Sequence, residues 1–221
     1  MSRIRSEGTK MYVQTAEEGA AVPMTAITKA APCVITFSAL PDEFVDGRIV
    51  VPDGTGFRSI DGKPFQIDVS GSTITLLDSD TSDEPDEAVL GTVTGVGMTE
   101  FCAGTANLTE GAGTDIDMTT MCDDERVTDT GLPAAPTWSA TGFHDKDDAS
   151  QSRMYALKRS KEKVVFAVQY RDNSGYTFLS NVNNYETRTG VDQPVAITAG
   201  GTVSKGTRRL SLALITSVLD S

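Results

Sequence analysis

The sequence predicts a mainly β protein, an antiparallel β-sandwich or open barrel with one flanking α-helix. Three features of the 221 residues predict this fold class. Gly, Thr, Ser and Asp separate short apolar runs along the whole chain, which is typical of many strands joined by turns. Asp-Gly pairs stand between β-branched runs, where they favour the type I′ turns of hairpins. A single segment combines helical apolar spacing with capping residues at its ends.

The first part of the chain is expected to form a short leader and a small β module. Residues 1–23 are a polar leader or arm with one strand-like patch at Met11–Gln14. Residues 24–87 are expected to be an inserted β module that ends in an acidic linker. Its β-branched and aromatic runs alternate with Asp-Gly turns, which indicates antiparallel strands. These runs are Cys33–Phe37, Arg48–Val51, Pro64–Val69 and Thr73–Leu77.

The acidic segment Asp78–Glu87 has the composition of a linker, because its carboxylates and proline bury too little apolar surface to hold one conformation. Asp78 and Asp80 occupy the first two ligand positions of a calcium loop. Asp83, however, stands where that loop needs glycine, and Val89 stands where it needs a bidentate glutamate. The sequence therefore does not predict a calcium site here.

Residues 88–221 are expected to form the larger β domain. In the run Lys163–Tyr170, alternate residues divide into two faces of which one is more apolar, as in a half-buried strand. The strands predicted in this domain are Gly91–Cys102, Asp115–Met121, Thr137–His144, Val164–Arg171, Tyr176–Asn183, Val195–Val203 and Thr207–Val218.

The helix of this domain is predicted from Ala149 to about Lys161. Either Asp147 or Asp148 can accept hydrogen bonds from its first backbone N–H groups, and basic residues at its C-terminal end suit the helix dipole. Two apolar side chains three positions apart give it a narrow stripe that can pack on a sheet. This stripe consists of Met154 and Leu157.

The charge and the side-chain inventory argue against tight nucleic-acid binding and against catalysis. The formal net charge is −12, with 31 acidic and 19 basic residues, so the surface repels phosphate. His144 is the single histidine, and no GxSxG turn accompanies it. The carboxylate pairs Asp115/Asp117 and Asp123/Asp124 are typical of a solvated edge rather than of an acid and base. We therefore expect no enzyme activity, no catalytic residues and no cofactor.

Cysteine usage and hydropathy indicate the compartment. Cys33, Cys102 and Cys122 are an odd number, lie far apart and lack CxxC spacing, so neither a disulfide framework nor a metal site is expected. The N-terminus has no apolar stretch long enough for a signal peptide, and no run approaches the ~20 apolar residues of a membrane helix. The protein is therefore expected to fold and assemble in the cytoplasm without a membrane partner.

Several short motifs in the larger domain are similar to those of a known protein family. The acidic-apolar segment Thr114–Asp124 is followed by Gly131-Leu132 and then by the strand-like run Thr137–Phe143, just before the expected helix. The later segment Asn184–Val195 forms a polar link before the last strands. From approximately Val93 to the C-terminus, the chain resembles the tail tube proteins of long, non-contractile tailed bacteriophages. Plain members of that family lack the small module.

This resemblance implies a tail-tube fold and a structural role in the virion tail. It implies hexameric rings, stacked into a tube through which double-stranded DNA passes into the host cell, and contacts with the tape measure protein, the tail terminator and the distal tail protein. The polar segments Ala103–Gly113 and Cys122–Ala135 are then expected to be loops between rings. The candidates for acidic charges on the lumen or the ring edge are Asp115, Asp117, Asp123, Asp124 and Glu125.

Two other functions stay open on the sequence. A tail terminator or a capsid decoration protein would share the β-rich composition but would stop at single rings or monomers. A carbohydrate-binding β-sandwich would need Trp138 and the tyrosines as an exposed stacking platform. Trp138 lies in a strand pattern, which favours a place in the core.

Overall fold

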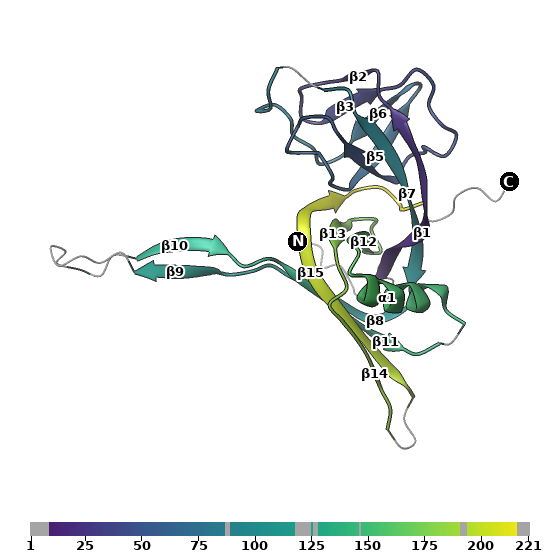
Figure 1. Cartoon of the computed structure of the whole chain (residues 1–221), viewed down its shortest axis with the longest axis vertical. Coiled ribbons are helices and arrows are strands. Elements are labelled where there is room, and N and C mark those ends of the chain that lie inside the picture. Colours follow the sequence, from purple (N-terminus) through teal and green to yellow (C-terminus); the bar gives the residue numbers. More distant parts are fainter. Residues whose placement is uncertain are drawn as a thin grey trace.

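The computed structural model describes residues 9–86, 89–117, 125, 128–145, 147–190 and 194–215. Within these residues the chain forms fifteen β-strands and one α-helix, and all the strand pairs are antiparallel. The prediction of a mainly β fold with one helix is confirmed. Figure 1 shows an upper lobe, a lower lobe and a long hairpin that projects sideways.

The lower lobe is built from two sheets joined by strands that bend from one sheet into the other. Its strands follow the order β7, β1, β12, β13, β15, β11 and β8. The order returns to its start because β7 and β8 are separated only by Cys102 and act as one bent strand. These strands are β1 (Lys10–Pro23), β7 (Thr92–Phe101), β8 (Ala103–Thr109), β11 (Thr137–Phe143), β12 (Val164–Gln169), β13 (Gly175–Ser180) and β15 (Ala196–Leu210), with β14 (Asn184–Arg188) paired to β15.

The upper lobe closes in the same way round a second core. Its strands are β2 (Ala26–Ile27), β3 (Cys33–Thr36), β4 (Ile49–Asp53), β5 (Phe65–Ser70) and β6 (Thr73–Leu76). They follow the order β2, β3, β6, β5, β4 and then β7, which pairs with β1, and β1 leads back into β2. Buried Phe57, Phe65 and Ile74 are among the side chains that fill this core.

The strands β1 and β7 are shared by both lobes, as Figure 1 shows along the right side of the molecule. At one end of this ribbon Val93 packs in the upper core, and at the other end Met11 and Phe101 pack in the lower core. A third cluster, which includes Tyr12 and Met98, lies on the opposite face of the ribbon. The two lobes are therefore connected through one continuous sheet.

The segment that follows β15, residues 211–215, is held between the lobes by two buried glutamines. From β5, Gln66 accepts hydrogen bonds from the N–H groups of Ser211 and Leu212 (both 2.9 Å) and donates to the Leu212 carbonyl (2.7 Å). From β12, Gln169 donates to the same carbonyl (2.9 Å). Gly47, at φ +86°, allows this approach, because a Cβ there would lie 2.1 Å from the Ala213 oxygen.

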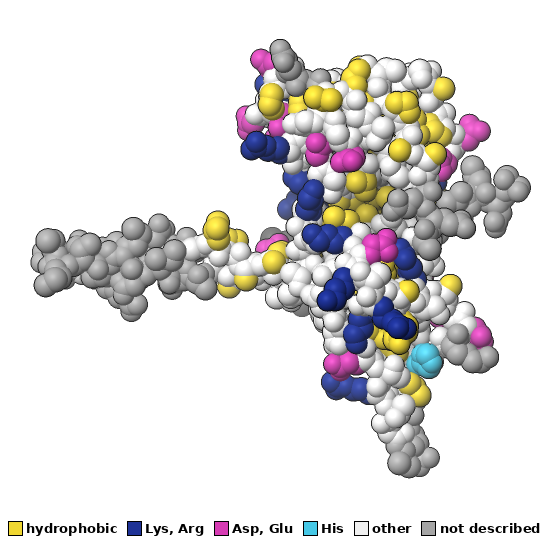
Figure 2. All heavy atoms as spheres, viewed as in Figure 1, with side chains coloured by type: hydrophobic (Ala, Val, Ile, Leu, Met, Phe, Trp, Pro, Cys, Tyr) yellow, Lys and Arg dark blue, Asp and Glu magenta, His cyan; other side chains and the backbone are white. Residues whose placement is uncertain are grey.

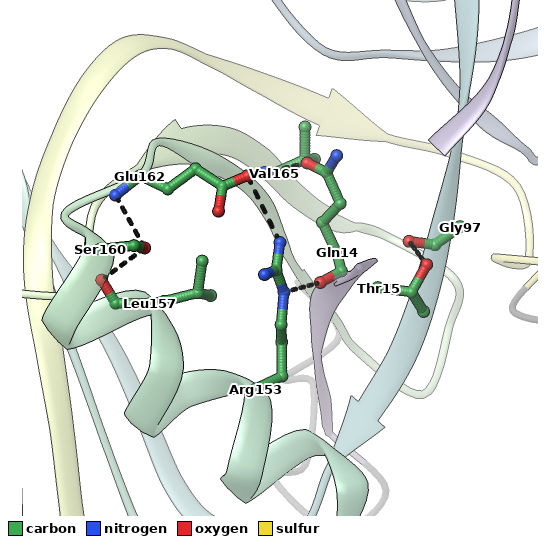
Figure 3. A network of polar contacts seen from close by, with 8 residues as sticks. All are labelled: Gln14, Thr15, Gly97, Arg153, Leu157, Ser160, Glu162 and Val165. Carbon is green, nitrogen blue, oxygen red and sulfur yellow. Dashed lines mark hydrogen bonds and ion pairs between the residues drawn. The ribbon is translucent and has the colours of Figure 1, made fainter. Parts of the chain in front are cut away.

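The helix α1 (Ala149–Ser160) packs on the lower core through its predicted stripe, since Met154 and Leu157 are both 0% exposed. Asp148 is the N-cap and accepts from the Ser150 N–H at 2.8 Å. Figure 3 shows how the helix is attached to β1 at an irregularity in that strand. The Arg153 guanidinium donates to the Gln14 carbonyl (3.4 Å), and the Gln14 side chain accepts from the Val165 N–H (2.8 Å).

Several strands depart from the expected pattern. Residues 103–109, expected to be a loop, form β8, and residues 184–188, expected to be a link, form β14. The two last strands are one bent strand, β15, while residues 211–215 are not strand. Gly206 lies in the gap between the two predicted strands and suggests a break there, whereas the backbone only bends.

Parts of the polar leader and of the acidic segment are built into the fold. The patch at Met11–Gln14 is the start of β1, which lies between β7 and β12 in the sheet. In the segment 78–86, Ser79 and Thr81 are buried, and their hydroxyls accept from the N–H groups of Cys33 (2.8 Å) and Ala30 (2.9 Å). Hydroxyl groups thus anchor a segment whose carboxylates gave it the composition of a linker.

Candidate assembly surfaces

A free-standing hairpin is the most prominent feature of the surface. The strands β9 (Gly113–Asp117) and β10 (Thr128–Pro133) form a separate two-stranded sheet and are hydrogen-bonded to each other. We call the described residues of this hairpin, 113–117 and 128–133, the arm. It continues the β8–β11 pair outward and extends far beyond both lobes (Figure 1). Leu132 on the arm is 93% exposed. An isolated hairpin is only marginally stable in water, so the arm has the properties of a contact element.

The predicted acidic candidates belong to this hairpin region. Asp115 and Asp117 lie on β9, paired with Thr130 and Thr128 of β10. Glu125 is exposed, while Asp123 and Asp124 lie outside the described residues. The expected loop 122–135 lies partly outside them too, and its residues 128–133 form β10.

A four-stranded sheet of the lower lobe has two open edges. In the order β8, β11, β15 and β14, the first strand pairs only with β11 and the last pairs only with β15, among the residues that the structure describes. Both edge strands therefore have one side without a strand partner in this part of the chain. Unpaired edges of this kind are templates for pairing with another chain.

The outer face of this sheet is uncharged across three strands. Cross-strand register places Thr105, Thr141 and Thr198 in one row, and the Thr105 and Thr141 hydroxyls hydrogen-bond at 2.6 Å. The next rows have the same character, with hydroxyl, amide or glycine at each position. They consist of Asn107, Ser139 and Gly200, and of Thr109, Thr137 and Thr202. Charged side chains of this face lie on the edge strand β14, where the Arg188 guanidinium and the Glu186 carboxylate form an ion pair at 3.3 Å.

The opposite face of the same sheet packs on the lower core. Ala140 and Ala199 are fully buried there, and Trp138 is 4% exposed. The Trp138 indole N–H donates to the Ser180 hydroxyl at 2.7 Å, and the ring lies 4.6 Å from that of Phe166. Trp138 is therefore a core residue, and an exposed stacking platform that includes it is wrong.

A shallow groove of about 360 Å³ lies between α1 and β14. Tyr155 and Tyr185 meet edge to face across it, with ring centroids 5.9 Å apart. Burial raises the pKa of Tyr185, and the nearby Asp148 carboxylate adds to this effect, so the hydroxyl stays neutral. One end of the groove is closed by a hydrogen bond between His144 Nδ1 and the Gln151 amide oxygen, which are 3.2 Å apart. The groove thus presents aromatic surface next to polar side chains, among them Asp145.

The reactive side chains in the described part of the chain form no metal centre. No group of three or more His, Cys, Asp or Glu side chains converges there. Cys33 is buried in the upper core and Cys102 is exposed. Burial raises the pKa of the Cys33 thiol, which keeps it protonated and unreactive. Among the described helical residues, no helix has the length and apolarity needed to cross a membrane.

Comparison with known proteins finds a distant likeness among solved structures. No family model matches the sequence, and no curated protein matches it. Among solved structures, the SPP1 tail tube, determined by solid-state NMR and cryo EM, is similar to this chain with a TM-score of 0.42 and 15% identity. The overlap covers 60% of this chain and 73% of the SPP1 chain. A likeness of this extent does not establish a family or a function.

Proposed function

We propose that this chain is a structural subunit of a phage tail tube, acting through self-assembly and not through catalysis. Copies join edge to edge into hexameric rings, the rings stack, and the channel conducts double-stranded DNA during ejection. The ring size, the site in the virion tail and the end contacts with tape measure, terminator and distal tail proteins follow from the sequence resemblance.

The observation that carries this proposal is the sheet β8–β11–β15–β14, which is open at both edges. In such a ring, β8 of one copy pairs with β14 of the next copy. Every contact therefore joins the β8 edge of one subunit to the β14 edge of its neighbour. Such a heterologous contact produces a closed ring if its rotation closes. Edge pairing also removes the aggregation hazard that an exposed strand would be in a monomer.

The uncharged outer face suits the inner wall of such a ring. Tight binding of DNA comes from Lys and Arg that replace counterions at the phosphates. The three hydroxyl-rich rows from Thr105 to Thr202 supply no cation, so DNA would slide along them without ion pairing. We assign Asp115 and Asp117 to the ring edge, because β9 lies on the projecting hairpin. For Asp123, Asp124 and Glu125 the lumen or the ring edge stays a proposal that follows from the sequence resemblance.

Electron microscopy of the purified full chain tests the proposal. At high concentration we expect long hollow tubes with a continuous central channel. Single rings of fixed height would instead support a terminator-like role, and a chain that stays monomeric would refute self-assembly altogether.

The wall assignment has its own test in the double variant Thr141→Lys/Thr198→Lys. These positions neighbour each other in one row, so every ring gains a cluster of cations. Tubes of this variant should retain short duplex DNA at low salt and release it as salt rises, measured by co-sedimentation. The matched control Thr141→Asp/Thr198→Asp and the unchanged protein should not retain it. Equal retention by the Lys and Asp variants would place the wall elsewhere.

A further inference from the structure

We propose that the junction between the two lobes is a binding site for a small oxyanion of the phosphate type, held by Lys63, Lys205 and Arg208. Lys63 comes from the loop between β4 and β5 of the upper lobe, whereas Lys205 and Arg208 come from β15 of the lower lobe. Figure 2 shows Lys and Arg side chains gathered where the two lobes meet. We call these three residues the junction cations. A single copy of the chain contains the whole site, so this inference stands apart from the tube proposal.

One turn of the upper lobe brings two of the junction cations together. The Lys63 ammonium donates to the carbonyl oxygens of Arg58 (2.8 Å) and Ser59 (2.9 Å). The Arg208 guanidinium donates to the same Ser59 oxygen at 2.9 Å. Two cationic nitrogens that share one oxygen in this way lie less than about 6 Å apart, so their charges repel each other.

Lys205 reaches the same turn from across the lobe junction. Its ammonium donates to the carbonyl oxygen of Asp61 at 3.4 Å. A Cβ at Gly62 would lie 2.8 Å from the Lys205 ammonium nitrogen. A Cβ at Gly206 would lie 3.2 Å from Cδ of Lys63. The two glycines therefore let each lysine side chain lie against the backbone of the other lobe.

The charge of the junction cations is not balanced by ion pairs. In the described part of the chain, no carboxylate forms a salt bridge with any of them. Asp61 and Glu84 are near Lys63, but hydrogen bonds hold both within the upper lobe. The Asp61 carboxylate accepts from the Thr55 N–H at 2.8 Å, and the Glu84 carboxylate accepts from the Ser59 N–H at 2.6 Å. Carbonyl groups carry no net charge, so the site stays cationic in a chain whose net charge is −12.

This unbalanced charge has a measurable cost. Burial lowers the pKa of Lys63, and the charges of Arg208 and Lys205 lower it further, while the two carboxylates act in the opposite direction. Nε of Arg208 is buried and has no hydrogen-bond partner among the described residues. The guanidinium lies 5.1 Å from the centre of the Phe65 ring, which supports it from one side. A bound anion would relieve the repulsion among the three cations.

The arrangement of the donors selects the ligand. The junction cations come from two lobes and therefore approach one point from different directions. A carboxylate presents two acceptor oxygens, whereas a phosphate group presents at least three. A guanidinium can bind two phosphate oxygens side by side, and an ammonium binds as a point charge. A doubly charged oxyanion thus fits the number of donors and their charge better than a carboxylate.

Titration calorimetry with inorganic phosphate tests the site on the full chain, at constant ionic strength set with chloride. We expect one phosphate per chain. With phosphate at about a hundredfold its Kd, mass action should raise Tm by roughly 5–11 °C. The variant Lys205→Gln changes an exposed side chain and should weaken phosphate binding about tenfold. The matched control Lys29→Gln removes an exposed lysine that pairs instead with Asp86, and it should bind phosphate like the unchanged protein.

A parallel titration with glycerol phosphate identifies the source of the ligand. Equal affinity for both compounds would support a site that takes the terminal phosphate of a larger molecule, and binding of inorganic phosphate alone would support a site for the free ion. Exclusion of phosphate from the surface would raise Tm equally in the unchanged protein and in Lys205→Gln. The inference is overturned by that result, by unchanged affinity in Lys205→Gln, or by an equal loss in Lys29→Gln. None of these outcomes depends on whether the chain forms tubes.

Discussion

Replacing Gln66 with methionine should release the C-terminal segment from between the lobes. Gln66 is 0% exposed, and its amide makes four hydrogen bonds with backbone groups. Two of these bonds satisfy the N–H groups of Ser211 and Leu212, and the others reach the carbonyls of Leu212 and Gly47. Methionine has a similar volume and offers the backbone no comparable partner.

The cost follows from the number of bonds. Each contributes about 0.5–1.5 kcal/mol, and groups left unsatisfied cost more, but the segment can detach and regain water. We therefore expect a loss of about 3 kcal/mol in the free energy of unfolding. For a chain of this length that corresponds to a fall in Tm of roughly 6–12 °C.

Urea unfolding at low protein concentration measures this loss, and hydrogen exchange locates it at residues 211–215. The Gln169→Met variant completes a double-mutant cycle, because Gln169 donates to the same Leu212 carbonyl. The double variant should cost less than the sum of the single variants. A loss below about 1 kcal/mol for Gln66→Met, with unchanged protection of the Leu212 amide, would contradict the bond count.

Three further outcomes are expected. Ser180→Ala leaves the buried N–H of Trp138 without its partner and should cost about 1–3 kcal/mol in unfolding free energy, with the fluorescence of this single tryptophan as the readout. In the native protein Cys102 should react readily with a thiol reagent and Cys33 only after unfolding. Because burial raises the pKa of the Cys33 thiol, its contribution to stability is complete below the unfolded pKa and declines as pH rises through the folded one, which unfolding curves across alkaline pH would detect. Asp148→Ala removes the N-cap of α1 and should cost about 1 kcal/mol in thermal or urea unfolding.

The helix was predictable from local chemistry. Capping by Asp148 and the Met154/Leu157 stripe are decided within the segment itself, and the structure has both. The position of strand β12 in the sequence was predictable, but the burial of both its faces was not. Its second face, with Val165 and Ala167, is buried in the cluster between the lobes, a contact that no periodicity within the strand can reveal.

Strand continuity was the harder problem. β8 and β14 are polar because their outer faces carry Thr, Asn and charged residues, so short windows resemble loops. Their pairing with β11 and β15 supplies the stability, and such pairing is non-local. The candidate surface had a partial signal, the unusual concentration of Thr and Ser at alternate positions of Thr137–Phe143.

The chain leaves β1 for the upper lobe and returns from it into β7, and the positions of these two points bear on how the protein could be redesigned. Pro23 and Thr92 face each other as a cross-strand pair, so the backbone leaves and re-enters the ribbon at points about 5 Å apart. A tight two-residue turn could join Pro23 to Thr92, and such a turn would remove residues 24–91 at one point of the ribbon. The upper lobe is in this sense a single insertion into the ribbon, and its removal would also take away the partner of β7 and the Gln66 side chain that holds residues 211–215.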